Sequence, residues 1–193
     1  LVGSEMCIRD SLNIVRIGTS GSVQADIPVD SFVISEKSIG CDGVLRFYAN
    51  NESVCDHPFE EAFIRHCRWT SSAARPYVVN ADPGLVDRLY DEEHTIKGVT
   101  LTAVGFYGPQ GRVLRLPLAM PGINDRITAF RYEGYKVTNY EMESAAITGL
   151  CNLLGHRAAT ICLIIANRIN GDASADYHSY MNKLIRYTLE KLS

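Results

Sequence analysis

The most constraining feature of this sequence is the nearly uninterrupted apolar run Ala158–Ala166. Successive side chains of a strand point to opposite faces, so a strand is apolar throughout only where both faces are covered. Strands of this kind are typical of parallel sheets packed between helices. The run therefore predicts an α/β protein. It is followed by Asn167 and Arg168, at the strand end where open α/β sheets bind their ligands.

Size and composition narrow the class of protein. With 193 residues, 46% of them hydrophobic, the chain can bury a substantial core and is expected to form one domain. Its net charge of -3 contains no long run of either sign, which argues against nucleic-acid or membrane partners. No apolar stretch approaches the ~20 residues of a membrane span, and we expect a cytoplasmic protein. The six cysteines form no CxxC pair or Cys/His cluster, so we expect no metal.

Another predicted strand is followed directly by a helix, and two carboxylates lie where the helix starts. Residues 134–138 are β-branched and aromatic, as in a strand, and apolar residues then recur at helical spacing from Ala145 until Gly155. Glu141 and Glu143 therefore lie at the helix start, where carboxylates interact favourably with the helix dipole. Alone, this pattern is typical of a capped core helix. Its place between two other polar strand exits favours a binding site.

A glycine-rich stretch follows the first predicted strand, Leu12–Ile17. Gly18–Gly21 is expected to form a loop whose backbone amides and hydroxyls face an anion. A single GxxG is a weak signal, because an ordinary turn has the same pattern. Arg16, two residues before the first glycine, favours the anion site over the turn.

The predicted strand Gly98–Gly105 leads into a loop that carries Gln110 and Arg112. An amide presents an acceptor beside a donor, which matches the edge of a pyrimidine, and Arg112 can donate to a second carbonyl group. Phe106 can stack on the ring. The alternative is a surface turn with solvated polar residues.

Four strand exits together resemble the nucleoside phosphorylase family, specifically its pyrimidine-specific branch. In chain order they are Arg16–Gly21, Gly105–Arg112, Tyr140–Ser144 and Ala166–Arg168. The likeness runs from about Leu12 to Ser193. It implies a three-layer α/β fold with a mixed, largely parallel central β-sheet flanked by helices. It also implies a pentosyltransferase of pyrimidine salvage that splits uridine with phosphate into uracil and ribose 1-phosphate.

The resemblance implies a role for individual residues. Phosphate would be bound by Arg16 and Thr19. Uracil would be bound by Ser20, Gly21, Phe106, Gln110, Arg112 and Arg168, and ribose by Thr19, Glu141, Met142 and Glu143. The residues expected to be catalytic are Arg16, Gln110, Arg112 and Glu143. No metal or organic cofactor is implied, and inorganic phosphate is the co-substrate.

Two positions bear on the choice of nucleoside. Arg168 stands where purine-specific relatives carry an Asp, which favours a pyrimidine. Ala166 replaces a bulkier aliphatic residue, which loosens the expected pocket around C5 of the base. A purine nucleoside phosphorylase or a nucleosidase of the same fold remains an alternative, as does a non-catalytic nucleoside-binding protein.

The beginning of the chain departs from the family pattern. Leu1–Asp10 matches nothing in the family, whose first strands and further phosphate-binding groups precede the strand of Arg16. We therefore expect residues 11–193 to form a single domain that lacks its first strands, and this chain alone to be an incomplete enzyme. Relatives assemble as dimers or hexamers, so we expect the complete protein to be a homo-oligomer.

Overall fold

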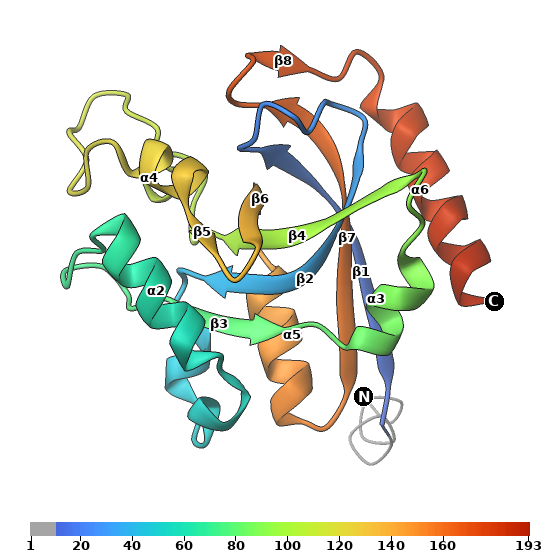
Figure 1. Cartoon of the computed structure of the whole chain (residues 1–193), viewed down its shortest axis with the longest axis horizontal. Helices are drawn as coiled ribbons and strands as arrows, with labels where there is room; N and C mark the ends of the chain where they lie inside the picture. Colours follow the sequence, from blue (N-terminus) through green and yellow to red (C-terminus); the bar gives the residue numbers. More distant parts are fainter. Residues whose placement is uncertain (1–10) are drawn as a thin grey trace.

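The computed structural model describes residues 11–193, and the expectation about Leu1–Asp10 lies outside this range. A mixed eight-stranded sheet forms the centre of the molecule (Figure 1). The strands are β1 (Asn13–Ser22), β2 (Phe32–Gly40), β3 (Tyr77–Asn80), β4 (Thr95–Thr102), β5 (Arg131–Tyr132), β6 (Tyr135–Glu141), β7 (Arg157–Asn167) and β8 (Asp172–Ala173). The helices are α2 (His57–Cys67), α3 (Pro83–Leu89), α4 (Ile123–Ala129), α5 (Ser144–Leu153) and α6 (Tyr177–Leu192), with 3-10 turns η1 (Val44–Phe47), η2 (Asn51–Val54) and η3 (Gly108–Gln110).

The sheet has the strand order β3-β2-β4-β6-β1-β7-β8, with β5 against β6. The pairs β1–β7, β2–β4 and β4–β6 are parallel. In addition, Phe32–Ser35 of β2 pairs antiparallel with β7. Because β2 contacts both β4 and β7, the strands β2, β4, β6, β1 and β7 close into a ring. The predicted mixed sheet flanked by helices is confirmed.

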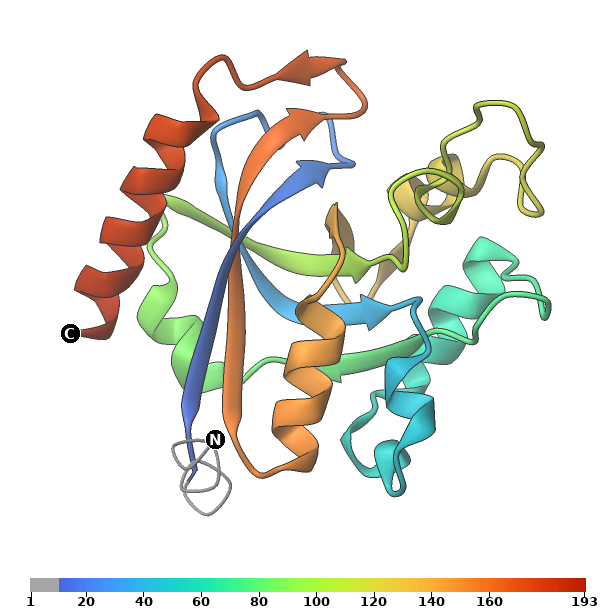
Figure 2. The same cartoon turned by 180° about the vertical axis from the view of Figure 1, so that it is seen from behind.

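The apolar run seen in the sequence is strand β7, and its residues from Ala158 to Ile164 are buried. Ile161 and Leu163 belong to a core cluster that also contains Leu85 of α3 and Leu184 of α6. Figure 1 shows α3 and α6 together on one side of the sheet and α2 and α4 on the other. Helix α5 also packs against β7 and lies across the sheet in Figure 2. The predicted covered strand is therefore confirmed.

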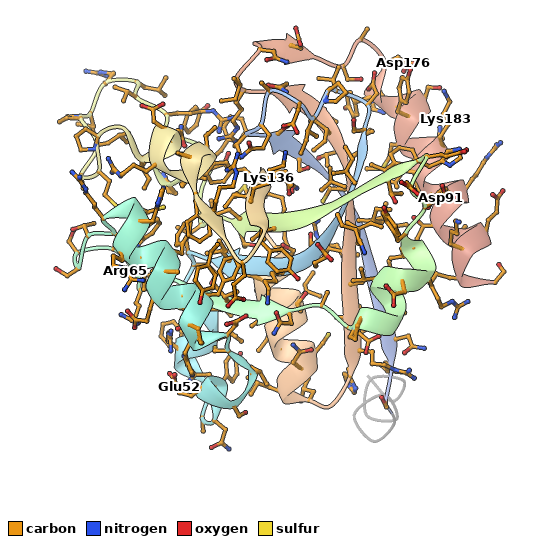
Figure 3. All side chains as sticks on the ribbon, viewed as in Figure 1. Glu52, Arg65, Asp91, Lys136, Asp176 and Lys183 are labelled. Carbon is orange, nitrogen blue, oxygen red and sulfur yellow. The ribbon has the colours of Figure 1, made fainter. Side chains whose placement is uncertain are left out.

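Charged side chains such as Glu52, Arg65 and Lys183 lie on the exposed surface (Figure 3). Asp91, also labelled there, accepts a hydrogen bond from Lys191 Nζ at 3.0 Å. This contact ties α6 to the segment that follows α3. Within residues 11–193, no helix has both the length and the apolar character that crossing a membrane requires.

The expected glycine-rich loop is wrong, because Gly18–Gly21 continues strand β1 and pairs with β7. The two glycines have a different role, which is to leave space. A Cβ atom on Gly18 would lie 2.5 Å from Nη1 of Arg16, and one on Gly21 would lie 3.2 Å from Nε of Arg168. Both glycines therefore allow a guanidinium group to lie against the strand backbone.

Candidate active site

The candidate site lies where β1 and β6 separate. These strands pair only at Gly21 with Tyr140 and at Ser22 with Asn139. Beyond this point a cavity of about 570 Å³ opens, with Arg16 on the β1 wall and Glu143 at the end of β6 on the other. A neighbouring irregularity in the β1–β7 register, between Ser20 and Gly21, helps to shape the cavity.

The structure brings all the predicted site residues to this cavity. They are Arg16, Thr19, Ser20, Gly21, Phe106, Gln110, Arg112, Glu141, Met142, Glu143 and Arg168. They come from β1, from the loop after β4, from the β6–α5 junction and from the end of β7. The chain segments are far apart in sequence, so their convergence depends on the sheet topology.

Glu141 is fixed at the β6–α5 junction by four hydrogen bonds. Its Oε1 accepts from Thr102 Oγ1 at 2.5 Å and from Ser144 Oγ at 2.7 Å. Its Oε2 accepts from the backbone amides of Glu143 and Ser144, both at 2.8 Å. The side chain is only 1% exposed, and its hydrogen bonds satisfy amides at the start of α5. The predicted helix start is confirmed, with Glu141 as the last residue of the strand rather than within the helix.

Arg16 spans the gap between the two walls. One guanidinium nitrogen donates to Glu143 Oε2, and Nη1 lies 3.4 Å from Glu141 Oε2 and from Cys162 Sγ. Burial raises the pKa of Cys162 to about 12, so this thiol is neutral at pH 7. Burial alone would lower the pKa of Arg16, but its neighbours Cys162, Glu141 and Glu143 together raise it. Arg16 is therefore a permanent cation in this part of the cavity.

Two other arginines meet at Gln110 at the opposite end. Arg112 Nη1 donates to Gln110 Oε1 at 2.7 Å, and Arg168 Nη2 donates to the same oxygen. Arg168 Nη1 also donates to the Gln110 carbonyl group at 3.3 Å. The Gln110 side chain is buried. Two guanidinium groups therefore fix the position of one amide group.

The charges at this end are not balanced by carboxylates. Neither Arg112 nor Arg168 forms an ion pair with an acidic residue in the described part of the chain. Burial lowers the pKa of Arg112, and burial together with the nearby Arg112 lowers the pKa of Arg168 to about 10. Such a pocket favours a ligand with electron-rich carbonyl groups or developing negative charge.

Aromatic rings support both arginines. The Arg112 guanidinium lies 3.8 Å from the centre of the Phe106 ring, and that of Arg168 lies 4.4 Å from the centre of the Tyr140 ring. Both distances are typical of cation–π contacts. Phe106 lies at the cavity as predicted, but in this structure its ring stacks on Arg112.

One hydroxyl group in the cavity lacks a partner. Ser20 is 5% exposed, and its Oγ makes no hydrogen bond to any residue that the structure describes. The Nε atom of Arg168 is likewise buried without a partner among these residues. Buried polar groups normally find hydrogen-bond partners, so both atoms are available to a ligand or to water.

The sequence interpretation assigned no site role to Tyr140, Ile165 and Met181, which also line the cavity. Tyr140 precedes Glu141 at the β6–α5 junction. The only sequence signal that its side chain faces the cavity was the alternation of side-chain directions along a strand. Ile165 lies opposite the register irregularity of β1 and β7. Met181 comes from α6, whose packing position cannot be read from local sequence.

A larger cavity of about 810 Å³ lies on the other side of the loop after β4. Its lining is mainly apolar and includes Trp69, Leu116, Met120 and Ile123. Arg112 borders both cavities. The smaller cavity is the candidate active site because it contains the convergent charged and polar groups. Within residues 11–193, no three His, Cys, Asp or Glu side chains are grouped as metal ligands would be.

Comparisons with known proteins identify relatives of this chain. Uridine phosphorylase A of Schistosoma mansoni is 36% identical over 160 residues, which cover 82% of this chain and 49% of that protein. Inactive uridine phosphorylase B of the same organism is 36% identical over 87 residues, 40% of this chain and 26% of that protein. The chain spans about half the length of the curated relatives that it matches over most of its own length.

The fold also matches a solved structure. The crystal structure of a Trypanosoma brucei nucleoside phosphorylase, which shows uridine phosphorylase activity, superposes with a TM-score of 0.75. The match has 23% sequence identity and covers 93% of this chain and 63% of that chain, and it supports the fold alone. The family model described as Phosphorylase superfamily matches residues 6–188. With the ring of strands, the cavity between β1 and β6 and this match along nearly its whole length, the chain belongs to the phosphorylase superfamily.

Proposed function

We propose that the protein containing this chain catalyses the phosphorolysis of uridine to uracil and ribose 1-phosphate. The observation that carries the proposal is the pairing of Arg112 and Arg168 on Gln110 at one end of the cavity, opposite Arg16 at the other. The end with the two paired arginines can donate hydrogen bonds to a base with two carbonyl groups. The end with Arg16 can bind an anionic nucleophile. The names of the relatives support the same reaction.

The base end would stabilise the departing uracil. As the bond between C1′ and the base nitrogen breaks, its electron pair moves into the base and spreads over the carbonyl oxygens. The amide of Gln110 and the guanidinium groups of Arg112 and Arg168 would donate to these oxygens more strongly as the charge develops. Ser20 Oγ and Gly21 would complete this subsite, with Phe106 beside it.

The other end would bind phosphate and sugar. Arg16 and Thr19 would hold hydrogen phosphate, whose oxygen forms the new bond to C1′ and whose proton ends on uracil. Glu143 would accept hydrogen bonds from the ribose hydroxyls, with Met142 against the sugar. Glu141 supports this subsite through Arg16 and through the backbone of Glu143, because its own acceptor positions are already filled. We propose no metal or organic cofactor for this reaction.

Release of the free base tests the proposal. The protein is incubated with uridine, adenosine or inosine, with and without phosphate, and the products are separated chromatographically. We expect uracil and ribose 1-phosphate only when uridine and phosphate are both present. Release of adenine or hypoxanthine would favour a purine phosphorylase, and release of uracil without phosphate would favour a nucleosidase.

A second candidate is a nucleoside-binding protein without turnover. It is favoured by the similarity to inactive uridine phosphorylase B. It is also favoured because, among the residues that the structure describes, Arg16 alone supplies a positive charge at the anion end of the cavity. Thermal stabilisation by uridine without product formation would identify this case.

We also propose that the protein is a cytoplasmic homo-oligomer, a dimer or a hexamer. The family resemblance supports this assembly. Light scattering coupled to size-exclusion chromatography tests it, and a monomeric mass would contradict it.

A further inference from the structure

Arg16 is shared between the two subsites that the proposed function separates. Its guanidinium pairs with Glu143, the residue proposed to bind sugar, although Arg16 itself is proposed to bind the anion. The Arg16 side chain is 15% exposed and that of Glu143 is 52% exposed, so the ion pair joins a largely buried cation to a carboxylate that faces the open cavity. A ligand that enters the anion subsite therefore meets an arginine that already has a partner.

The two carboxylates around Arg16 differ in their freedom to move. The carboxylate of Glu141 is 1% exposed and holds four hydrogen bonds besides its contact with Arg16. The side chain of Glu143 is 52% exposed. Among the described residues, only Arg16 donates a hydrogen bond to the Glu143 carboxylate. Glu141 is thus a fixed partner of Arg16, and Glu143 can leave at small structural cost.

The charges around Arg16 do not favour a bound anion while this pair is closed. One guanidinium faces two carboxylates, and the Cys162 thiol beside it is neutral. The cluster carries a net negative charge, which opposes an incoming phosphate in a partly buried site. Removal of Glu143 from the cluster leaves one cation and one anion and frees a donor of Arg16. Anion binding and opening of the Arg16–Glu143 pair are therefore linked.

We propose that the Arg16–Glu143 ion pair is a latch that the anionic co-substrate opens, which releases Glu143 to the sugar hydroxyls. The identity of the two ligands rests on the proposed function. The latch itself requires only that an anion competes with Glu143 for Arg16. Because linkage is reciprocal, each ligand strengthens the binding of the other. The anion alone binds weakly, since it must first displace a carboxylate.

Binding of inorganic phosphate without nucleoside tests the latch directly. Its dissociation constant is measured by calorimetry for the wild type, Glu143→Gln and the control Glu61→Gln. Glu61 pairs with Arg75 on the surface and lies outside the cavity, so its substitution makes the same change in net charge. We expect Glu143→Gln to bind phosphate at least about fivefold more tightly than the wild type, and Glu61→Gln to match the wild type.

The opposite outcomes are clear. Unchanged, weaker or undetectable phosphate binding by Glu143→Gln, with the circular dichroism of a folded protein, overturns the latch. An equal gain in Glu61→Gln also overturns it, because the effect would then come from net charge. This measurement does not depend on uridine, so failure of the proposed function leaves its result intact.

A second measurement tests the link to the nucleoside. The dissociation constant of uridine is determined with and without saturating sulfate, an anion that does not attack the sugar. We expect uridine to bind the wild type at least about fivefold more tightly with sulfate, and this gain to vanish in Glu143→Gln. Equal affinity with and without sulfate in the wild type contradicts the coupling. If uridine does not bind at all, the proposed function fails, and phosphate binding still decides the latch.

Discussion

Gly18 leaves the space that the Arg16 guanidinium occupies, since a Cβ atom on Gly18 would lie 2.5 Å from Nη1 and 2.8 Å from the guanidinium carbon of Arg16. The conformation of Gly18 is ordinary extended strand, so backbone freedom is not the reason for glycine here. The absence of a side chain at position 18 therefore allows the guanidinium of Arg16 to take its observed position.

Gly18→Ala is expected to displace this guanidinium and weaken phosphate binding by about tenfold or more, because a small misplacement of a binding group has a large effect. The Michaelis constant for phosphate, or its dissociation constant, provides the measurement. Gly108→Ala is the control. Its added carbon would lie 3.9 Å from Leu118, an ordinary contact, and Gly108 does not line the active-site cavity. Equal effects of both substitutions would count against the role of Gly18.

Arg112→Ala is expected to lower kcat/KM for uridine by ~10²-fold or more, on the scale of losing one strong transition-state donor. The substitution also removes a donor to Gln110 and the cation that stacks on Phe106. Steady-state kinetics with uridine provide the measurement. Unchanged turnover would exclude Arg112 from the mechanism.

Activity should fall as pH rises through about 10, because burial and the neighbouring Arg112 lower the pKa of Arg168 to this value. The cationic form is the donor to the base, so deprotonation removes it. Arg168→Gln should lower kcat/KM at neutral pH and remove this step from the pH profile. Wild-type kcat/KM that stays constant through pH 10, in a protein that remains folded, would contradict the assignment.

The lowered pKa of Arg168 also affects the free energy of unfolding. A cation whose pKa is lower in the folded than in the unfolded state destabilises the folded state while it is charged, and stability recovers as pH rises through about 10. Arg168→Met is therefore expected to retain or raise the unfolding midpoint at pH 7 while uridine binding weakens. A clear loss of stability would show that the contacts of Arg168 with Gln110 outweigh its desolvation.

Glu141→Gln should lower the free energy of unfolding by about 2 kcal/mol, because an amide cannot accept all four hydrogen bonds of the carboxylate. Denaturant titration measures this loss. The exposed Glu61→Gln is the matched control and should change stability by less than about 0.5 kcal/mol. A stable Glu141→Gln protein would contradict the role of Glu141 at the start of α5.

Ala166→Val should restrict the base pocket around C5. We expect the ratio of kcat/KM for uridine to that for 5-methyluridine to rise about tenfold, since small apolar groups give discrimination of this size. Competition between the two nucleosides measures the ratio. An unchanged ratio would place C5 of the base away from Ala166.

The sequence predicted those strands and helices whose pattern of apolar residues matches the way they are buried in the fold. Ala158–Ala166 could be recognised because only a strand covered on both faces is apolar at successive positions. The β6–α5 junction could be recognised because the hydrophobic period changes there. The site residues on the four strand exits were identified by family resemblance, and the sheet brings each of these predicted site residues to one cavity.

The remaining features depend on tertiary contacts. Gly18–Gly21 looked like a loop, because the sequence does not show that Arg16 and Arg168 need the space beside these glycines. Met181 was missed because the place of α6 against the sheet is set by tertiary packing, such as that of Leu184 in one buried cluster with Ile161 and Leu163 of β7. The interaction of two arginines with Gln110 likewise joins the ends of separate strands.

The limited pairing of β1 with β6 has a consequence for design and evolution. Because the pairing of these strands ends at Gly21 and Tyr140 on the cavity side, the mouth of the cavity is a fork in the sheet. The width of this mouth depends on where the backbone pairing of β1 with β6 ends. Substitutions that extend the β1–β6 pairing by one residue pair would narrow the entrance to the cavity. They would do so even at positions whose side chains do not contact the ligand.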